Sequence, residues 1–575
     1  MASKFRVSEN AMDMLRNGRI LAEKESPDSM IKRVVESISK VEKKFSTSRS
    51  FVGRFEASFE ELLKSGRCVM STPIMTNAGR YEGKPLSACI VPKINLGNRK
   101  MLREEITKIH IDGMGTGFNL DGMENPVSTL RYLNKVAVDS TESGGEDRPV
   151  GNIAILSVDS PYIKEFIMAK TEGDKNGEKW KFNISVNATD KFMNAVSKRQ
   201  NYWLSNGTKV DATEIMDMIA RSAHACGDPG LAFMHRFEKD NPTPGLGRYE
   251  ALAPCGEVGL LSGEFCEFGY MNLNRFLRVK GGLFEIDMEG LRKATGVMIR
   301  VLDNALEISI NNCELDATKD VMRSRRKIGI GICGLADMLA RMGVPYDSKE
   351  GRTIATDMVA FINYHSKLES HKLARERGSF PAISGSRYME TPGFLEIRYG
   401  EFGTEHVIKR MWTDISNKIR ETSLLRNVTT VALPPTGRSA AVIDASFGIE
   451  PFFTLSDQNG ILNRTLHDEL LKLALDKDII ILAGKRGRIG DIEQIPIGTR
   501  RAYKTALEIN PSSHLKMQAA IQRVVDDGIS KTVNLPFDAT VDEVRRLYLE
   551  AYDMNLKGIT IFRDGSRKIQ PRKLV

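Results

Sequence analysis

The sequence predicts an α/β protein built around a buried, largely parallel sheet. Of its 575 residues, 41% are hydrophobic, and from residue 66 onward short apolar runs alternate with longer amphipathic stretches. Buried parallel strands read as continuous apolar runs, and the helices that alternate with them cover the faces of one sheet. No linker-like, repeated or low-complexity tract interrupts the alternation. One large domain is therefore favoured over several small ones.

The first element in order is a small helical N-terminal region, predicted for residues 1–65. Its apolar residues, such as Met30, Val34 and Ile38, recur at helical spacing among charged residues. Seven runs then predict strands: 86–93, 181–187, 231–237, 327–332, 428–433, 531–536 and 558–563. Amphipathic stretches at 291–309 and 351–378 predict helices between them.

Composition excludes several classes of protein. No run approaches the roughly eighteen apolar residues of a membrane span, and the N-terminus lacks the pattern of a secretory signal. We therefore expect a cytoplasmic protein without a membrane partner. The net charge of +9 is spread over both halves of the chain. Solvated basic faces explain this better than a nucleic-acid groove, and phosphorylated small molecules would suit the charge equally well.

The seven cysteines predict redox thiols rather than structural sites. They lack CxxC or Cys/His spacing, which argues against a metal site and against a disulfide framework. Most free cysteines in proteins are inert core residues. Cys255 and Cys266 are the exceptions that we expect here, because they lie close together in a segment that also contains Glu257.

The segment Ala-Pro-Cys-Gly-Glu, residues 253–257, predicts a tight loop. Pro254 and Gly256 flank the cysteine, which suits a loop tip that directs the thiol into a cavity. If residues 255–257 were extended instead, Cys255 and Glu257 would lie on one face, a few ångströms apart. In either case a thiol and a carboxyl group would address one ligand.

Two glycine-containing segments predict ligand contacts less specifically. Residues 432–453 pass from a strand-like run through Pro-Pro-Thr-Gly into a helix, and backbone amides with Thr436, Arg438 and Ser439 would form a phosphate cradle. An ordinary strand-to-helix turn is the alternative. Residues 329–334 fit the GxGxxG pattern of dinucleotide sites. Their position in mid-chain argues against a dehydrogenase, so we expect no NAD.

These segments resemble, in order, blocks of the catalytic subunit of ribonucleotide reductase, and most of all the adenosylcobalamin-dependent class II enzymes. The blocks include STPIMTNAGRYEGKPLSACI, PCGE, EFCEFGYMNL, RRKIGIGICGLADML, LPPTGRSAAVIDASFGIEPFF and LKGITIFRDGSR. The resemblance runs nearly end to end. It implies a ten-stranded α/β barrel over residues 66–575, made of two five-stranded parallel half-sheets around a central finger loop.

The resemblance also implies the roles of the cysteines. Cys255 would form a thiyl radical that abstracts the 3′ hydrogen of a ribonucleotide, and Glu257 would take the proton of the 3′ hydroxyl. Cys89 and Cys266 would supply the reducing equivalents and end as a disulfide. The positions that match residues around the nucleotide and its phosphates are Thr72, Ser87, Ala88, Gly115, Ala253, Pro435, Thr436, Gly437, Arg438 and Ser439.

The chain departs from the family pattern at several positions. Ala253 replaces an asparagine, and loss of one positioned donor typically lowers a rate on the order of a hundredfold. Arg438 stands where a small hydroxyl residue is commoner, and Phe562 replaces a tyrosine that class I enzymes use for radical transfer. This exclusion favours adenosylcobalamin as cofactor.

Partners follow from the same comparison. The substrate would be a ribonucleoside di- or triphosphate. The final residues lack the cysteine pair of the family, so a thioredoxin-like protein or a small thiol would act as reductant. Residues 143–156 resemble a specificity loop, although residues 120–130 are short for an effector site, and a nucleotide effector and a homodimer are compatible with the sequence.

Two alternatives remain beside the reductase. With Ala253 the same barrel could catalyse another radical reaction on a nucleotide, such as epimerisation or dehydration. The chain could also be an inactive, nucleotide-binding relative. Product analysis with a ribonucleotide, adenosylcobalamin and dithiothreitol would separate the reductase from the other radical reaction. An inactive relative would neither cleave the cobalt–carbon bond of the cofactor nor exchange cofactor hydrogen with solvent.

Overall fold

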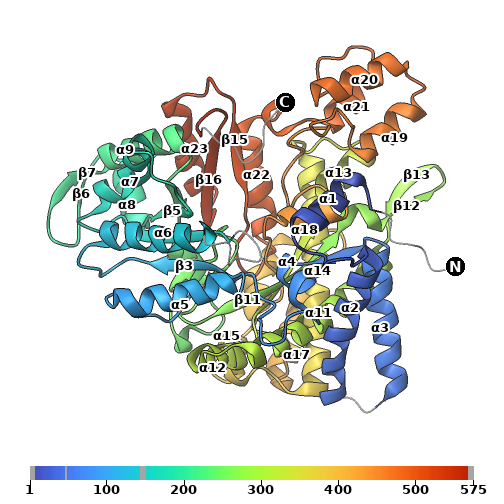
Figure 1. The fold of residues 1–575 in the computed structure, drawn as a ribbon, viewed down its shortest axis with the longest axis horizontal. Helices are drawn as coiled ribbons and strands as arrows, with labels where there is room; N and C mark the ends of the chain where they lie inside the picture. Colours follow the sequence, from blue (N-terminus) through green and yellow to red (C-terminus); the bar gives the residue numbers. More distant parts are fainter. Residues whose placement is uncertain (1–6, 46–47, 143–149, 568–575) are drawn as a thin grey trace.

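A ten-stranded sheet forms the centre of the computed structural model, which describes residues 7–45, 48–142 and 150–567 (Figure 1). Five neighbouring strands are parallel and form one half of the sheet. They are β2 (Cys89–Ile90), β3 (Gly115–Asn119), β4 (Asn152–Ser157), β5 (Phe182–Asn187) and β8 (Gly230–Ala232). The expected specificity loop at 143–156 ends in β4, and its residues 143–149 lie outside the described part of the chain.

The second half contains two more parallel pairs. The long strand β11 (Phe265–Asn272) pairs with β14 (Ile328–Cys333), and β15 (Thr532–Leu535) pairs with β16 (Gly558–Arg563). The halves meet in antiparallel pairs, β2 with β11 and β8 with β16. This arrangement confirms the prediction of two parallel half-sheets. The tenth strand, β1 (Cys68–Met70), also lies antiparallel to β11.

The predicted strand at 428–433 is wrong as a regular element. Only isolated parallel bridges, Ile330 to Val431 and Leu433 to Ile529, connect β14 with the β15 side through this segment. The backbone amides of Thr430 and Val431 both donate to the Asp526 carboxylate, at 2.7 and 3.0 Å. Because a side chain takes these donors, the segment fills the gap in the barrel without forming a continuous ladder.

The predicted strand at 231–237 is also too long. Strand β8 ends at Ala232, and helix α10 (Met234–Lys239) begins two residues later. The Arg236 guanidinium stacks on the Phe233 ring and donates to the carbonyls of Leu556 and Tyr552. These contacts require the helical spacing of Phe233 and Arg236, so tertiary contacts override the apolar run.

Helices cover the first half-sheet on the side that carries the second large core cluster. They are α5 (Arg99–Ile111), α6 (Pro126–Glu142), α7 (Ile163–Lys175), α8 (Asp190–Ser197), α9 (Ala212–Cys226) and α23 (Val541–Asp553), and the hairpin β6 (Asn201–Trp203) with β7 (Lys209–Asp211) lies at their edge. In Figure 1 these elements occupy the left of the molecule.

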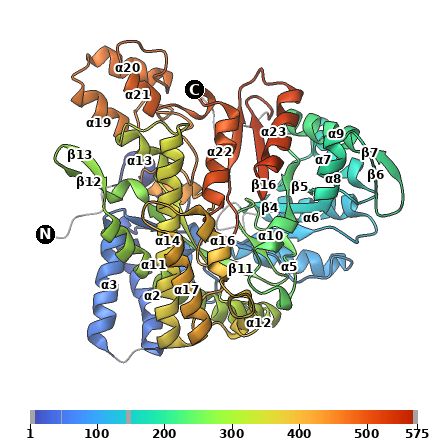
Figure 2. The same ribbon diagram turned by 180° about the vertical axis from the view of Figure 1, so that it is seen from behind.

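A larger core cluster surrounds β11 and β14. Its helices are α4 (Thr72–Asn77), α11 (Met288–Asn312), α12 (Asp316–Arg325), α13 (Leu335–Arg341), α14 (Lys349–Arg377), α15 (Arg387–Glu390), α16 (Phe394–Tyr399), α17 (Lys409–Thr422), α18 (Gly437–Val442) and α22 (Pro511–Gln522), and the hairpin β12 (Leu277–Lys280) with β13 (Leu283–Ile286) precedes α11. Figure 2 shows α11, α14 and α17 beside one another.

The N-terminal region is helical, as predicted. It contains α1 (Glu9–Asn17), α2 (Pro27–Ser39), the 3₁₀ helix η1 (Lys40–Lys44) and α3 (Arg49–Lys64). These helices share the core cluster of the barrel, and buried Glu42 pairs with Arg300 and Arg377. The division into 1–65 and 66–575 stays a prediction.

Helices α19 (Arg464–Lys472), α20 (Lys477–Arg486) and α21 (Ile497–Ala502) form a lobe that projects from the barrel in both views. A third core cluster, including Leu466, Ile489 and Tyr503, holds the lobe together and joins it to α13 through Ala336 and Ala340. Among the helices that the structure describes, none is long and apolar enough to cross a membrane.

The GxGxxG segment lies inside the barrel wall. A Cβ atom on Gly329 would stand 2.5 Å from the Phe268 ring, and one on Gly331 would stand 2.8 Å from the Tyr270 ring. Glycine is required because aromatic side chains of the paired strand β11 cover these positions. The motif therefore serves close packing between strands.

Candidate active site

A short hairpin carries Cys255. Strands β9 (Ala251–Leu252) and β10 (Gly259–Leu260) pair antiparallel, and the amide of Gly256 donates to the Ala253 carbonyl at 2.8 Å. Proline at the second and glycine at the fourth position suit such a turn, and Gly256 has φ +74°. The segment is thus a tight loop with Cys255 near its tip, and the extended alternative for residues 255–257 is wrong.

Contacts from several elements fix this finger hairpin. The side-chain amide of Asn183 on β5 donates from Nδ2 to the Pro254 carbonyl at 3.2 Å. The amide of Gly528 donates to the Glu257 carbonyl at 2.9 Å, and the buried Lys327 ammonium donates to the Gly259 carbonyl at 2.7 Å. The barrel wall therefore holds both arms of the hairpin.

A cavity of about 400 Å³ opens beside the hairpin, and Cys255 lines it. Cys255 is exposed, whereas the other six cysteines are buried. The lining of the cavity combines apolar and polar groups, among them Leu231, Ile559, Phe562, Asp228, Asn534 and Thr560. A volume of this size is typical of pockets that bind small molecules. The thiol at the hairpin tip thus faces a space that a ligand can enter.

Glu257 stands at the base of the same loop and is buried. Desolvation, with a smaller contribution from the Asp527 charge, raises the pKa of its carboxyl group to about 7, although backbone amides of Glu257 and Cys255 oppose the rise. One carboxyl oxygen is buried and has no hydrogen-bond partner among the described residues. A carboxyl group that titrates near neutral pH is suited to accept and return a proton.

Asp527, whose charge acts on Glu257, forms an ion pair with Lys327, the residue that donates to the Gly259 carbonyl of the hairpin. The Lys327 ammonium lies 3.1 Å from the Asp527 carboxylate and is 1% exposed. Interactions with Asp527 and Tyr249 raise the pKa of Lys327 despite its burial, so the ammonium stays charged. The pair therefore provides a fixed charge arrangement behind the loop.

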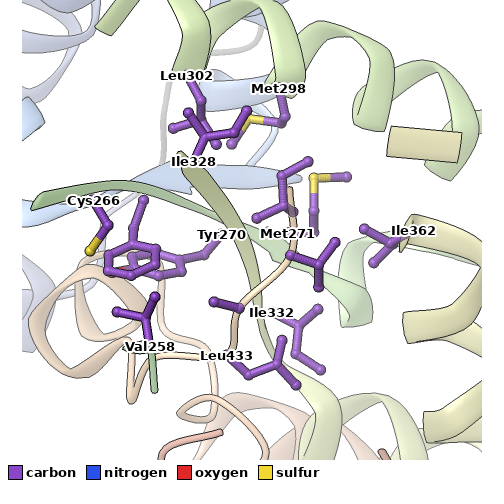
Figure 3. Close-up of a cluster of buried hydrophobic side chains, with 14 of the residues drawn as sticks. Val258, Cys266, Tyr270, Met271, Met298, Leu302, Ile328, Ile332, Ile362 and Leu433 are labelled. Atoms are coloured by element: carbon purple, nitrogen blue, oxygen red, sulfur yellow. The ribbon is translucent and has the colours of Figure 1, made fainter. Parts of the chain in front are cut away.

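Cys89 and Cys266 lie directly opposite each other on β2 and β11. Directly opposite residues of antiparallel strands have Cα atoms roughly 4.5–5.5 Å apart, which is within the range that a disulfide spans. Burial raises the pKa of the Cys266 thiol well above its usual value, and the neighbouring Cys89 and Glu257 contribute. In Figure 3, Cys266 and Val258 of the finger hairpin lie at the same end of the core cluster.

Several residues expected around the nucleotide gather beside this cysteine pair. Gly115 pairs with Cys89 across β2 and β3, and its amide donates to the Ala88 carbonyl at 2.9 Å. A Cβ on Gly115 would stand 3.2 Å from the Pro254 side chain, so Gly115 lies between the pair and the hairpin. Thr72 begins the buried helix α4, directly after Ser71, whose amide donates to a β11 carbonyl.

Other expected contacts are engaged within the protein. The Ser87 hydroxyl donates to Glu267 at 2.5 Å, and Thr436 Oγ1 accepts the Gly448 amide at 2.9 Å. Ala253 is fully buried and pairs with Val258. In the turn of Pro435–Ser439, Pro435 and Gly437 line the cavity, Ser439 is buried, and Arg438 is half-buried.

Sequence reasoning missed the charged groups of the cavity wall. Asp228 binds Lys170 and Arg567, and Glu450 binds the buried Lys531. Each pair joins residues far apart in the chain. The only local signal was a polar residue close to an apolar run, such as Asp228 two residues before β8.

Comparisons with known proteins agree with this architecture. The family model described as "Ribonucleotide reductase, barrel domain" matches residues 114–562. A vitamin B12-dependent ribonucleoside-diphosphate reductase of Mycobacterium tuberculosis is 32% identical over 602 residues, covering 99% of this chain and 81% of that protein.

Two further relatives have related names. A vitamin B12-dependent ribonucleoside-diphosphate reductase of Thermoplasma acidophilum is 32% identical over 554 residues, covering 91% of this chain and 67% of that protein. A vitamin B12-dependent ribonucleotide reductase of Streptomyces coelicolor is 25% identical, covering 94% of this chain and 63% of its own length. Together with the two half-sheets and the finger hairpin, these matches establish that the chain belongs to the ribonucleotide reductase barrel-domain family.

Proposed function

We propose that the chain reduces ribonucleoside diphosphates to 2′-deoxyribonucleoside diphosphates with adenosylcobalamin as cofactor. The names of the M. tuberculosis and T. acidophilum relatives support the diphosphate and the cofactor. The single observation that carries the proposal is the cysteine arrangement. Two buried thiols face each other on paired strands, and a third stands on a fixed loop tip in a cavity.

The proposed reaction begins at Cys255. As a thiyl radical it takes the 3′ hydrogen atom of the substrate, while Glu257 accepts the proton of the 3′ hydroxyl. A carbon radical next to the 2′ hydroxyl makes departure of that group far easier than direct displacement. The rigid hairpin contributes by keeping the thiol and the carboxyl group in one orientation.

The cysteine pair then completes the reduction. The 2′ hydroxyl leaves as water with a proton from the pair, and Cys89 with Cys266 supplies two electrons and two protons in total. Cys255 finally returns its hydrogen atom to the 3′ carbon, and Glu257 returns its proton to the 3′ oxygen. One ribonucleotide and two thiols thus become one deoxyribonucleotide, one disulfide and one water.

The cavity beside Cys255 has a mixed apolar and polar lining, which would suit the nucleoside part of adenosylcobalamin. Asp228, Asn534 and Thr560 would hold its polar groups, and Leu231 and Phe562 would contact its base. When bound, the cofactor supplies the one-electron oxidation of a nearby thiol. Because Cys255 is exposed in the cavity, the bound substrate and cofactor would have to exclude water and so protect the resulting radical from side reactions.

The remaining contacts and partners belong to the same proposal. Thr72, Ser87, Ala88, Gly115 and Ala253 would line the nucleotide, and residues 435–439 would contact its phosphates. A thioredoxin-like protein or a small thiol would reduce the disulfide again. We also propose a cytoplasmic location, a homodimer and a nucleotide effector.

Anaerobic turnover tests the proposal. Purified protein is incubated with each of four ribonucleoside diphosphates, adenosylcobalamin and dithiothreitol, with Cys255→Ser as the matched control. We expect deoxyribonucleotide from the wild type only, and one Cys89–Cys266 disulfide per product when the reductant is withheld. A different nucleotide product would favour the epimerase or dehydratase alternative, and equal inactivity of both proteins would favour the inactive relative.

A further inference from the structure

Glu267 is a buried carboxyl group that the proposed reaction does not use. It follows Cys266 on β11 and is fully buried. Desolvation raises the pKa of its carboxyl group to about 7, and one of its oxygens has no hydrogen-bond partner among the described residues. Because burying an ionisable group costs free energy, the contacts that Glu267 makes indicate what it does.

A chain of hydrogen bonds connects this carboxyl group to the segment that carries Cys89. Ser87 Oγ donates to Glu267 Oε1 at 2.5 Å, and Ser309 Oγ on helix α11 donates to the same oxygen. The amide of Leu86 in turn donates to Ser309 Oγ at 2.8 Å. Glu267 therefore binds residues 86 and 87, one directly and one through the helix.

The ladder between the two cysteine-bearing strands is short. Strand β2 has two residues, and its pairing with β11 consists of Cys89 with Cys266 and Ile90 with Phe265. A register slip of one residue turns every side chain to the other face of a strand. On one side of Cys89 the pairing continues, since the Val91 amide donates to the Glu264 carbonyl at 3.0 Å and the Gly263 amide donates to the Val91 carbonyl at 2.7 Å. On the other side the ladder ends at the pair of Cys89 with Cys266, and the contact of Ser87 with Glu267 follows it there.

We propose that Glu267, acting through Ser87 and Ser309, is the positioning residue that holds Cys89 opposite Cys266. The inference rests on the proposed role of these cysteines as the reducing pair. In this interpretation, the hydrogen bond from Ser87 to Glu267 connects the β2 segment to β11 in addition to the backbone ladder. Hydrogen bonds from the Ser87 and Ser309 hydroxyls to Glu267 Oε1 offset part of the cost of burying this carboxyl group.

The equilibrium of the Cys89–Cys266 disulfide with a dithiothreitol redox buffer tests this inference without substrate or cofactor. The measurement uses the full chain in a Cys255→Ala background, which prevents exchange with that thiol, and peptide mass spectrometry quantifies the disulfide. Glu267→Leu removes the acceptor, and Ser309→Ala removes one link of the chain.

We expect both variants to lower the disulfide equilibrium constant about tenfold, because the dithiol form then no longer holds Cys89 opposite Cys266. This corresponds to a reduction potential about 30 mV higher. Glu267→Gln keeps the accepting oxygen and should stay within about twofold of the wild type. The control Ser222→Ala removes a buried hydroxyl on α9 that donates to the Ile167 carbonyl on α7. It should leave the disulfide equilibrium constant unchanged.

Wild-type potentials in both Glu267→Leu and Ser309→Ala would overturn the inference, as would a Gln variant that behaves like Leu. If Glu267→Leu does not fold, Ser309→Ala decides alone. The proposed function fails separately: absence of turnover by the wild-type protein would refute the reductase, whereas shifted potentials in Glu267→Leu and Ser309→Ala would still support the positioning role.

Discussion

Replacement of Glu257 by glutamine should make the protein more stable at alkaline pH while abolishing turnover. The buried carboxyl group has a pKa of about 7 in the folded protein instead of 4.5. The difference of about 2.5, at 1.36 kcal/mol per pKa unit, makes the charged form cost about 3 kcal/mol in the folded state. Glutamine has nearly the same shape and carries no charge.

The sign of the pH dependence follows from the raised pKa. Below about pH 4.5 the carboxyl group is protonated in both states and costs nothing. Between pH 4.5 and 7 the unfolded chain loses its proton first, so the folded wild type loses stability as pH rises. Above pH 7 the full cost of about 3 kcal/mol is present, and Glu257→Gln should recover most of it.

Urea unfolding at pH 5 and pH 8 measures this effect. The matched control is Glu104→Gln, which changes an exposed glutamate on helix α5. We expect the stability advantage of Glu257→Gln over the wild type to grow with pH, and that of the control to stay flat. Parallel pH curves for Glu257→Gln and the wild type would refute the assignment of Glu257 as a desolvated, titrating base.

Three further predictions test the site. Turnover should rise with pH through a midpoint near 7 as Glu257 loses its proton. Asp527→Asn should lower the pH of that midpoint, because it removes a charge that raises the Glu257 pKa. An unchanged midpoint would contradict this electrostatic coupling. Cys89→Ser or Cys266→Ser should abolish the product formed in a single turnover without reductant, and full product from either variant would remove the pair from the mechanism. Lys327→Met should lower unfolding free energy by roughly 3–5 kcal/mol, since it leaves the buried Asp527 carboxylate uncompensated; an unchanged urea midpoint would show that the pair contributes little.

The finger loop shows how far local chemistry could be predicted. Pro254 and Gly256 specify a turn through their own backbone preferences, so the loop at Cys255 followed from the sequence. Strands β5, β14, β15 and β16 were recognisable as short, largely apolar runs, which is also a property of neighbouring residues. In contrast, residues 428–433 read as a strand, and only the position of Asp526 explains why they do not form one.

The candidate site could be predicted only in part. The resemblance to the reductase family selected Cys89, Cys255, Glu257 and Cys266 as a set. The raised pKa of Glu257 could not be predicted, because burial depends on how the hairpin packs against the barrel wall. Nor could the sequence indicate that the Ser87 hydroxyl donates to a buried carboxyl group.

By itself, the sequence determined the α/β class, the turn at residues 253–256 and the residue types available for radical chemistry. These properties depend on neighbouring residues, whose preferences act over a few positions. Only the tertiary structure decided that Cys89 faces Cys266, that Cys255 faces a cavity and that Lys327 supports the hairpin. Those contacts join segments far apart in the chain, and strand pairing and desolvation arise only after the barrel has assembled.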